Sequence, residues 1–338
     1  MAFQTSAFFP QKLYDQITEV RVSKPELLTT AADRRSKPEE LTYDGKLTLL
    51  VADQPGRRLT MAGSDPLAMG NRYEFLGRIV RVLGTEFDGL IATMDVIEEL
   101  LIIDQLTVAA GADSFLDDTL LIASVNNGGL QGSAWELNNR PSSFSTDSLA
   151  HLRLDGIKLT WRVDLQDKDA GQTLDDCAQV MEDAARADLP IFFEALPVRK
   201  VPQGYETVPT AGELVKLAGV VPALGSSSDN LWLITPPGED FRQVARATTL
   251  PLLLMGDELP VEPAALLDAI AAGLKAGANV RGVTVGRSVL FAANAEDPAA
   301  VAHAIEALVH DGVDARTALA RLAEARGNEQ DWLLKLFP

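Results

Sequence analysis

The sequence is poor in the residues from which disulfides and transition-metal sites are usually built. It has a single cysteine, Cys177, and only three histidines in 338 residues. One cysteine excludes an internal disulfide framework and a thiolate cluster for a metal. His151, His303 and His310 do not have the spacing of a zinc motif. We therefore expect a protein that works without a metal and without another cofactor.

Long apolar runs and an excess of positive charge are also lacking. No stretch is apolar for long enough to cross a bilayer, and the N-terminus lacks the basic region and apolar core of a secretory signal. Lysine and arginine number 30 against 48 acidic residues, for a net charge of −18, which repels nucleic-acid phosphates. We expect a cytoplasmic protein that binds neither nucleic acid nor membranes. A local basic pocket still allows a small phosphorylated ligand.

A dinucleotide-binding fingerprint is missing as well, because no G-x-G-x-x-G follows an apolar strand. What the chain has is a strict alternation of short apolar strands and helices over residues 46–310. This alternation predicts one α/β domain, a (β/α)8 TIM barrel. Residues 1–45 are expected to form a helical extension, with helices near 12–22 and 24–35, and residues 311–338 a second one. The predicted strands cover residues 46–52, 89–94, 118–125, 157–163, 189–196, 230–235, 250–255 and 282–285.

The fourth predicted strand carries a row of polar side chains. Lys158, Thr160 and Arg162 alternate there with apolar residues, so the three lie on one face. On an open sheet this face would be solvated. A closed parallel barrel has no solvated sheet face, so in the predicted fold Lys158 points inward and requires a role.

Active sites of such barrels lie at the carboxyl ends of the strands, and polar residues gather at those places in this sequence. We interpret them as a candidate site, although each one alone could belong to a solvated loop or a tight turn. Arg57 follows the first strand, and Gly256 and Gly286 offer backbone amides that could bind a phosphate. The loop over 132–148 is either a lid or a connection. The strand-end residues are Asp53, Asp95, Asn126, Lys158, Glu194, Asp257 and Arg287.

A buried lysine suggests covalent chemistry. Burial and the second positive charge of Arg162 both favour a neutral amine on Lys158, and a neutral amine can form a Schiff base with a carbonyl. Asp53 or Glu194 would then move protons. The alternative is that Glu194 simply pairs with Lys158 and both stay charged.

Four segments resemble class I aldolases of the deoxyribose-phosphate and tagatose-bisphosphate aldolase superfamily. They are VADQPGRR (51–58), GIKLTWRVD (156–164), FFEALPV (192–198) and GVTVGRSV (282–289). The resemblance implies a metal-independent lyase in which Lys158 and Glu194 match residues of the tagatose-bisphosphate branch, and in which Gly286 and Arg287 bind the substrate phosphate. The chain is similar, more narrowly, to aldolase-like barrel proteins of actinobacterial inositol-catabolism clusters. That likeness implies aldol cleavage of a phosphorylated keto sugar or keto acid, and the family implies a homo-oligomer.

One departure from the aldolase pattern matters. The imine lysine of the family lies on the sixth strand, where this chain has NLWLITPP, with Trp232 at or near the expected position. No lysine occurs between Lys216 and Lys275. Either Lys158 has taken over this role, since the other lysines lie in predicted helices, loops, termini or at a strand start, or the aldolase chemistry is lost. The second case leaves a barrel that binds or isomerises a sugar phosphate through Asp53 and Glu194. A further alternative is a magnesium or manganese site with oxygen ligands from Asp53, Asp95, Glu194 and Asp257.

Overall fold

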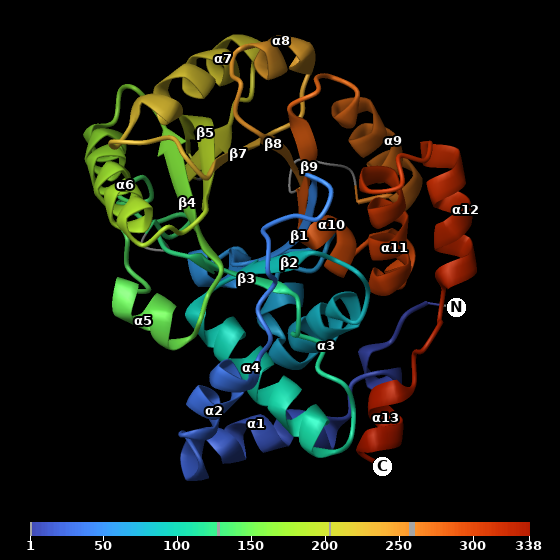
Figure 1. Cartoon of the computed structure of the whole chain (residues 1–338). Coiled ribbons are helices and arrows are strands. Elements are labelled where there is room, and N and C mark those ends of the chain that lie inside the picture. The colour runs from blue at the N-terminus through green and yellow to red at the C-terminus, as the bar shows by residue number, and fades with distance from the viewer. Residues whose placement is uncertain (1, 127–128, 203, 257–260) are drawn as a thin grey trace.

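Eight parallel strands close into a barrel in the computed structural model, and helices surround it (Figure 1). The strand order around the ring is β4-β3-β2-β1-β9-β8-β7-β5, and the pairing of β5 with β4 closes it. The predicted TIM barrel is therefore confirmed. The barrel strands are β1 (Leu47–Ala52), β2 (Gly89–Ala92), β3 (Leu120–Ser124), β4 (Gly156–Val163), β5 (Ile191–Val201), β7 (Leu231–Thr235), β8 (Leu252–Met255) and β9 (Val280–Val285).

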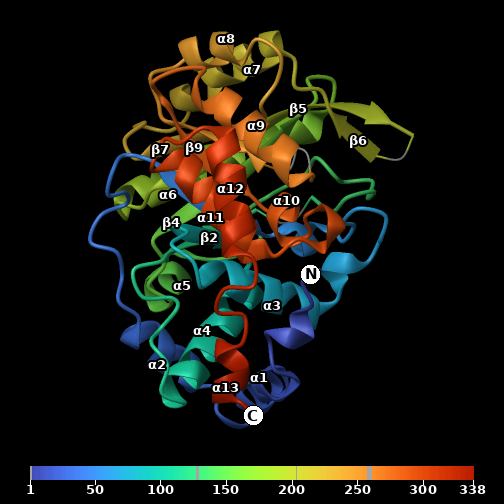
Figure 2. The same ribbon diagram turned by 90° about the vertical axis from the view of Figure 1, so that its right-hand side faces the viewer.

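The structure describes residues 2–126, 129–202, 204–256 and 261–338. Helices follow most of the strands and cover the outside of the barrel (Figures 1 and 2). Within the described residues, none of them is both long and apolar enough to cross a membrane. The helices are α1 (Gln11–Ser23), α2 (Leu27–Arg34), α3 (Arg72–Leu83), α4 (Met94–Ala109), α5 (Thr146–His151), α6 (Lys168–Arg186), α7 (Ala211–Val220), α8 (Phe241–Arg246), α9 (Pro263–Leu274), α10 (Arg287–Leu290), α11 (Pro298–Val309), α12 (Ala315–Ala325) and α13 (Trp332–Leu336).

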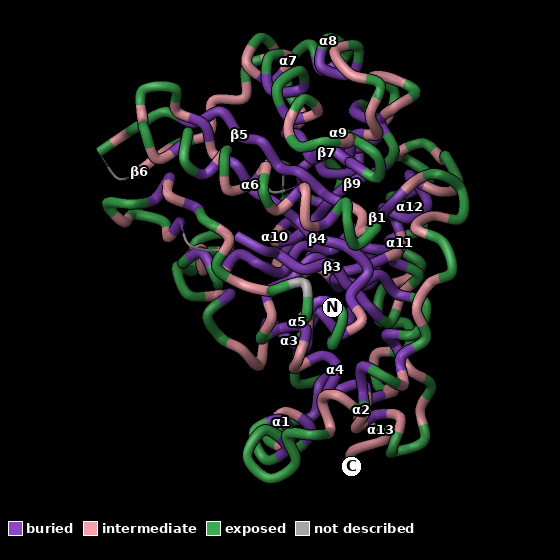
Figure 3. Tube along the Cα trace, turned by 60° about the vertical axis from the view of Figure 1, so that its left-hand side comes forward, coloured by how far each residue is buried: buried purple, intermediate pink, exposed green. Residues whose placement is uncertain are grey.

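The strands are buried on both faces, as Figure 3 shows by their colour. One apolar cluster fills the inside of the barrel and includes Leu49, Phe192 and Leu253, all without exposed surface. A second, larger cluster lies between the strands and the helices. Strands buried on both faces are typical of parallel barrels, and they explain why most strands in this sequence are continuous apolar runs.

β4 departs from that pattern because its two faces have different partners. Ile157, Leu159 and Trp161 face outward into the cluster under the helices, and the Trp161 indole donates a hydrogen bond to the carbonyl of Ala170 in α6 (2.8 Å). Lys158 on the alternate face lies inside the barrel and has no exposed surface. The expectation that this lysine points inward is confirmed.

The two terminal extensions pack on the barrel and share its outer core. Helices α1 and α2 lie beside α4 (Figures 1 and 2), and Phe9 and Leu13 are buried in the same apolar cluster as the barrel helices. At the other end of the chain, α12 packs against α11 and α9. The Lys46 ammonium, just before β1, donates to the carbonyl of Val309 at the end of α11 (2.7 Å).

The sequence did not predict three features. Strand β5 continues beyond the barrel and forms an antiparallel hairpin with β6 (Gly204–Thr207), which projects from the barrel (Figure 2). The short helices α5, α8 and α10 were also missed. Asp95 was expected at the end of the second strand, but it lies in the first turn of α4. Its carboxylate pairs with Arg72 in α3, so it belongs to the helical layer.

Candidate active site

Lys158 lies between two buried carboxylates inside the barrel. Its ammonium nitrogen is 2.9 Å from Asp53 Oδ2 and 3.1 Å from Glu194 Oε2. Lys158 and Asp53 have no exposed surface, and Glu194 is 4% exposed. The three residues come from β4, from the turn after β1 and from β5, so the barrel brings together the three predicted catalytic residues.

Further side chains hold both carboxylates. Ser124, the last residue of β3, donates a hydrogen bond to Asp53 Oδ2 (2.8 Å), and Thr160 donates to Glu194 Oε1 (3.3 Å). The Arg57 guanidinium lies 3.5 Å from Asp53 Oδ1 and 3.8 Å from Glu194 Oε1. The cluster therefore contains two cationic and two anionic side chains, which balance in charge.

The electrostatics of Asp53 follow from these contacts. Burial alone would raise the pKa of its carboxyl group. The positive charges of Lys158 and Arg57, with hydrogen bonds from Lys158 and Ser124, outweigh burial and hold the pKa of Asp53 well below its usual range. Asp53 is thus ionised in the folded protein at neutral pH.

A cavity of about 210 Å³ opens above this cluster at the carboxyl end of the barrel. That volume is below the roughly 300–1,000 Å³ of sites for drug-sized ligands, so it fits a small metabolite. Glu194 links the two regions, because it lines the cavity and also contacts Lys158. The described residues that line the cavity are Arg57, Leu59, Gly129, Gln131, Glu136, Asn139, Arg162, Glu194, Leu196, Tyr205, Thr207, Met255 and Arg287.

Three predicted binding residues, Arg57, Arg162 and Arg287, line this cavity. Arg162 is on β4, and Arg287 directly follows β9 as the first residue of α10. These two strands are four positions apart in either direction around the eight-stranded ring. Arg162 and Arg287 therefore approach the cavity from opposite sides of the barrel mouth.

The neighbours of Arg162 differ from those that the sequence suggested. Its guanidinium pairs with Glu136 (Nη1 to Oε1, 2.5 Å), donates to the carbonyl of Tyr205 (3.4 Å) and lies over the Tyr205 ring. The expected effect of Arg162 on Lys158 is therefore weakened by a carboxylate that neutralises it. Lys158 instead lies within ion-pair distance of two carboxylates, those of Asp53 and Glu194. The contact between Lys158 and Glu194 (3.1 Å) is the pairing that the alternative expects.

Three other predicted binding residues have structural roles. The Asn126 side chain donates to the carbonyls of Asn139 and Thr160 and accepts from the Thr160 amide, so its hydrogen-bonding capacity is used by the backbone. A Cβ atom on Gly256 would lie 2.4 Å from the carbonyl oxygen of Thr284, so a glycine is needed there for close packing. The Gly286 carbonyl accepts from the amides at positions 289 and 290. None of the three lines the cavity described above.

Several expectations lie outside the described residues or find no support. Asp257, Glu258, Asn127 and Gly128 are not described by the structure. Among the residues that it does describe, no group of histidine, cysteine or carboxylate side chains is arranged to hold a metal ion. Asp53 and Glu194 bind Lys158 instead.

The sequence missed the residues that the 129–139 loop and the β5–β6 hairpin bring to the cavity, above all Glu136 and Tyr205. The sequence left open whether the loop over 132–148 is a lid or a connection. In the structure this loop brings a buried carboxylate to the cavity, because Glu136 is 1% exposed and lines it. The hairpin carried no recognisable pattern. Ser124 could have been found, since it is a polar residue at the end of an apolar strand.

Trp232, which the resemblance places at or near the position of the aldolase imine lysine, lies inside the barrel. It belongs to the interior apolar cluster, and its ring centroid is 6.1 Å from that of Phe192. Phe192 is in register with Lys158 on one side and Trp232 on the other. An indole therefore fills this part of the barrel, two strands away from Lys158.

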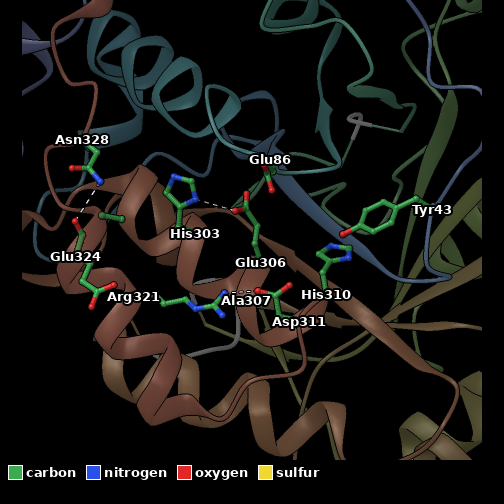
Figure 4. A pocket seen from close by; sticks show the side chains of 11 residues that line it. Tyr43, Glu86, His303, Glu306, Ala307, His310, Asp311, Arg321, Glu324 and Asn328 are labelled. Carbon is green, nitrogen blue, oxygen red and sulfur yellow. Dashed lines mark hydrogen bonds and ion pairs between the residues drawn. The ribbon is translucent and has the colours of Figure 1, made fainter.

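A second cavity, of about 350 Å³, lies at the opposite end of the barrel, and two of its lining residues are His303 and His310 (Figure 4). His310 follows α11 and lies between Asp44, ahead of β1, and Asp88, ahead of β2. These residues are at the amino ends of the strands, whereas the active sites of TIM barrels lie at the carboxyl ends. We place the candidate active site at the Lys158 end.

Comparison with known proteins agrees with the fold. The structure of Cgl0159 from Corynebacterium glutamicum is 29% identical, with a TM-score of 0.82 over 90% of this chain and 98% of that one. A fructose-bisphosphate aldolase from Slackia heliotrinireducens (14% identical, TM-score 0.60, 97% of both chains) and an archaeal fructose 1,6-bisphosphate aldolase (19% identical, TM-score 0.56, 84% and 100%) share the barrel. At such low identity the two aldolases show the fold alone. A search of curated proteins gave no match. The model of the Cgl0159-like family matches residues 45–305, and the chain belongs to this family.

Proposed function

We propose that this protein is a class I aldolase-type lyase that cleaves a small phosphorylated keto sugar or keto acid, with Lys158 as the amine. The observation that carries the proposal is the buried Lys158–Asp53–Glu194 cluster directly beneath a cavity with three arginines. Phosphate and carboxylate are the groups that guanidinium ions bind best. The likeness of the barrel to fructose-bisphosphate aldolases adds support at the level of fold.

The reaction begins with a proton transfer. The Lys158 ammonium gives a proton to Glu194, 3.1 Å away, and the freed amine adds to the substrate carbonyl. Loss of water leaves a protonated imine. A carboxylate then takes the proton of the β-hydroxyl group, the carbon–carbon bond breaks, and its electrons pass into the imine to form an enamine. Reprotonation and hydrolysis release the second product and restore Lys158.

The phosphate is expected at Arg287. This residue follows the last barrel strand, a position at which many TIM barrels bind phosphate. Arg57 is too close to Asp53 and Glu194 to serve mainly as a phosphate ligand, so it more naturally orients the carboxylates. A place in inositol or other carbohydrate catabolism stays a prediction from the resemblance.

One observation favours a second candidate function. Lys158 has no exposed surface and is bonded to two carboxylates. A lysine held in this way can donate a proton without becoming a nucleophile, and the cluster would then isomerise a sugar phosphate by moving protons between Glu194 and the substrate.

A turnover assay distinguishes the two functions. Wild-type protein is incubated with a panel of phosphorylated keto sugars and keto acids, and products are identified by mass spectrometry and by NMR in deuterated water. A lyase gives two smaller products from one member of the panel, and Lys158→Met and Lys158→Arg abolish them, since a guanidinium cannot form the imine. A product with the carbon skeleton of the substrate intact and one hydrogen replaced by deuterium would support the second function. Cleavage that survives in Lys158→Met would contradict both.

A further inference from the structure

The cavity is lined by an arginine at each of two opposite sides. Arg287 and Arg162 approach it from opposite sides of the barrel mouth, as the strand order requires. The Arg162 end is already occupied by a carboxylate, because Glu136 lies 2.5 Å from the guanidinium and also lines the cavity. A bound anion at that end would have to compete with this carboxylate.

Contacts with Arg162 and the Gly132 amide fix the position of the Glu136 side chain. Its side chain has no exposed surface, and its second oxygen accepts a hydrogen bond from the Gly132 amide (2.9 Å). Residue 204 in the hairpin is a glycine with a positive φ of 131°, and a Cβ atom there would lie 2.7 Å from Glu136 Oε2. The 129–139 loop and the hairpin thus hold the carboxylate against Arg162 from two sides.

We propose that the Glu136–Arg162 pair makes this end of the cavity neutral and selects a substrate with one anionic group and a polyhydroxylated tail. The inference rests on the proposed function only in assigning the anionic group to Arg287. The Arg162 side chain, whose charge Glu136 balances and which is 16% exposed, can donate hydrogen bonds to the oxygen atoms of sugar hydroxyls. A second phosphate at this end would meet the buried negative charge of Glu136. The substrate class is therefore a monophosphate and not a bisphosphate.

Hexitol phosphates test this without any chemistry at Lys158, because they have no carbonyl group and cannot form an imine. Binding of glucitol 6-phosphate and glucitol 1,6-bisphosphate is measured by titration calorimetry, and the ratio of their dissociation constants is compared among variants. Wild-type protein should bind the monophosphate at least as tightly. A unit charge about 6 Å from a ligand charge, at a permittivity of about 40, changes binding about tenfold.

The two members of the pair should have opposite effects. Glu136→Gln is expected to shift the ratio about tenfold toward the bisphosphate, and Arg162→Gln about tenfold away from it. The double variant should return to the wild-type ratio. Glu206→Gln is the matched control, because it removes one negative charge from the exposed part of the hairpin, where Glu206 pairs with Arg199 outside the cavity lining; its ratio should not change.

Three outcomes would overturn the inference. They are a tenfold or greater preference of the wild-type protein for the bisphosphate, an unchanged ratio in both single variants, and no binding of either hexitol. If Glu136→Gln does not fold, Arg162→Gln alone still tests the sign. The lyase proposal fails separately, through turnover, so an isomerase that prefers the monophosphate would keep this inference and exclude the lyase.

Discussion

Replacing Lys158 by methionine should destabilise the protein strongly, although methionine is apolar and of similar length. The change leaves Asp53, with no exposed surface, and Glu194, at 4%, without their common cation. Arg57 remains at 3.5 and 3.8 Å from them, so one positive charge then faces two buried negative ones. Removing one partner from a buried ion pair costs about 3–5 kcal/mol, and we expect a loss of that size in the free energy of unfolding.

A double variant separates this charge effect from packing. Lys158→Met combined with Asp53→Asn leaves Glu194 and Arg57 as a balanced pair, so the double variant should be about 2 kcal/mol more stable than Lys158→Met alone. Urea unfolding monitored by fluorescence and circular dichroism gives both values. A loss below about 1 kcal/mol in Lys158→Met, or an Asp53→Asn change that adds to the loss, would refute the ion-paired cluster.

Three further predictions concern other parts of the molecule. Arg287→Ala should weaken binding of glucitol 6-phosphate by at least about tenfold, because it removes a charged hydrogen bond. In turnover it should raise KM with little change in kcat. A large fall in kcat at unchanged KM would instead place Arg287 at the reacting carbonyl. Although burial lowers the pKa of His310, hydrogen bonds and charges of Asp88 and Asp44 raise it above the usual value, so its stabilising effect is complete below about pH 6.5 and is lost as pH rises through the raised value. The stability difference between wild type and His310→Gln, measured by urea unfolding, should therefore shrink from pH 6 to pH 9, and a constant difference would contradict this. Gly282 has a φ of 137°, and a Cβ atom there would lie 1.9 Å from the Leu47 carbonyl oxygen, so Gly282→Ala should lower the free energy of unfolding by more than about 3 kcal/mol. Gly171→Ala in helix α6 should not destabilise the protein, because no atom lies within 4 Å of the added Cβ. Equal unfolding midpoints for the two variants would contradict the close contact of β9 with β1.

The fold was accessible from the sequence because most of the barrel strands are short, apolar and followed by a helix. The position of Lys158 inside the barrel also followed, since a strand buried on both faces leaves a lysine no route to solvent. Asp53 and Glu194 were found as its partners because the carboxyl ends of parallel strands meet at one end of a barrel.

Other parts of the site depend on contacts that sequence does not encode locally. Asp95 follows a strand by only three residues, but the helix begins at Met94 and turns its side chain to Arg72. Asn126 has a polar side chain just after a strand, but its amide group donates hydrogen bonds to the backbone carbonyls of Asn139 and Thr160. Glu136 enters the cavity from a loop with no periodic pattern, so its pairing with Arg162 could be seen only in three dimensions.

The chemistry of Lys158 is the central claim, and reductive trapping measures it most directly. Protein is incubated with dihydroxyacetone phosphate and sodium borohydride, which converts an imine to a stable secondary amine, and the labelled peptide is identified by mass spectrometry. We expect one phosphate-bearing adduct per chain, on the peptide that contains Lys158, and no adduct in Lys158→Met or without borohydride. An adduct on another lysine, or full turnover of a substrate with no adduct on Lys158, would contradict it.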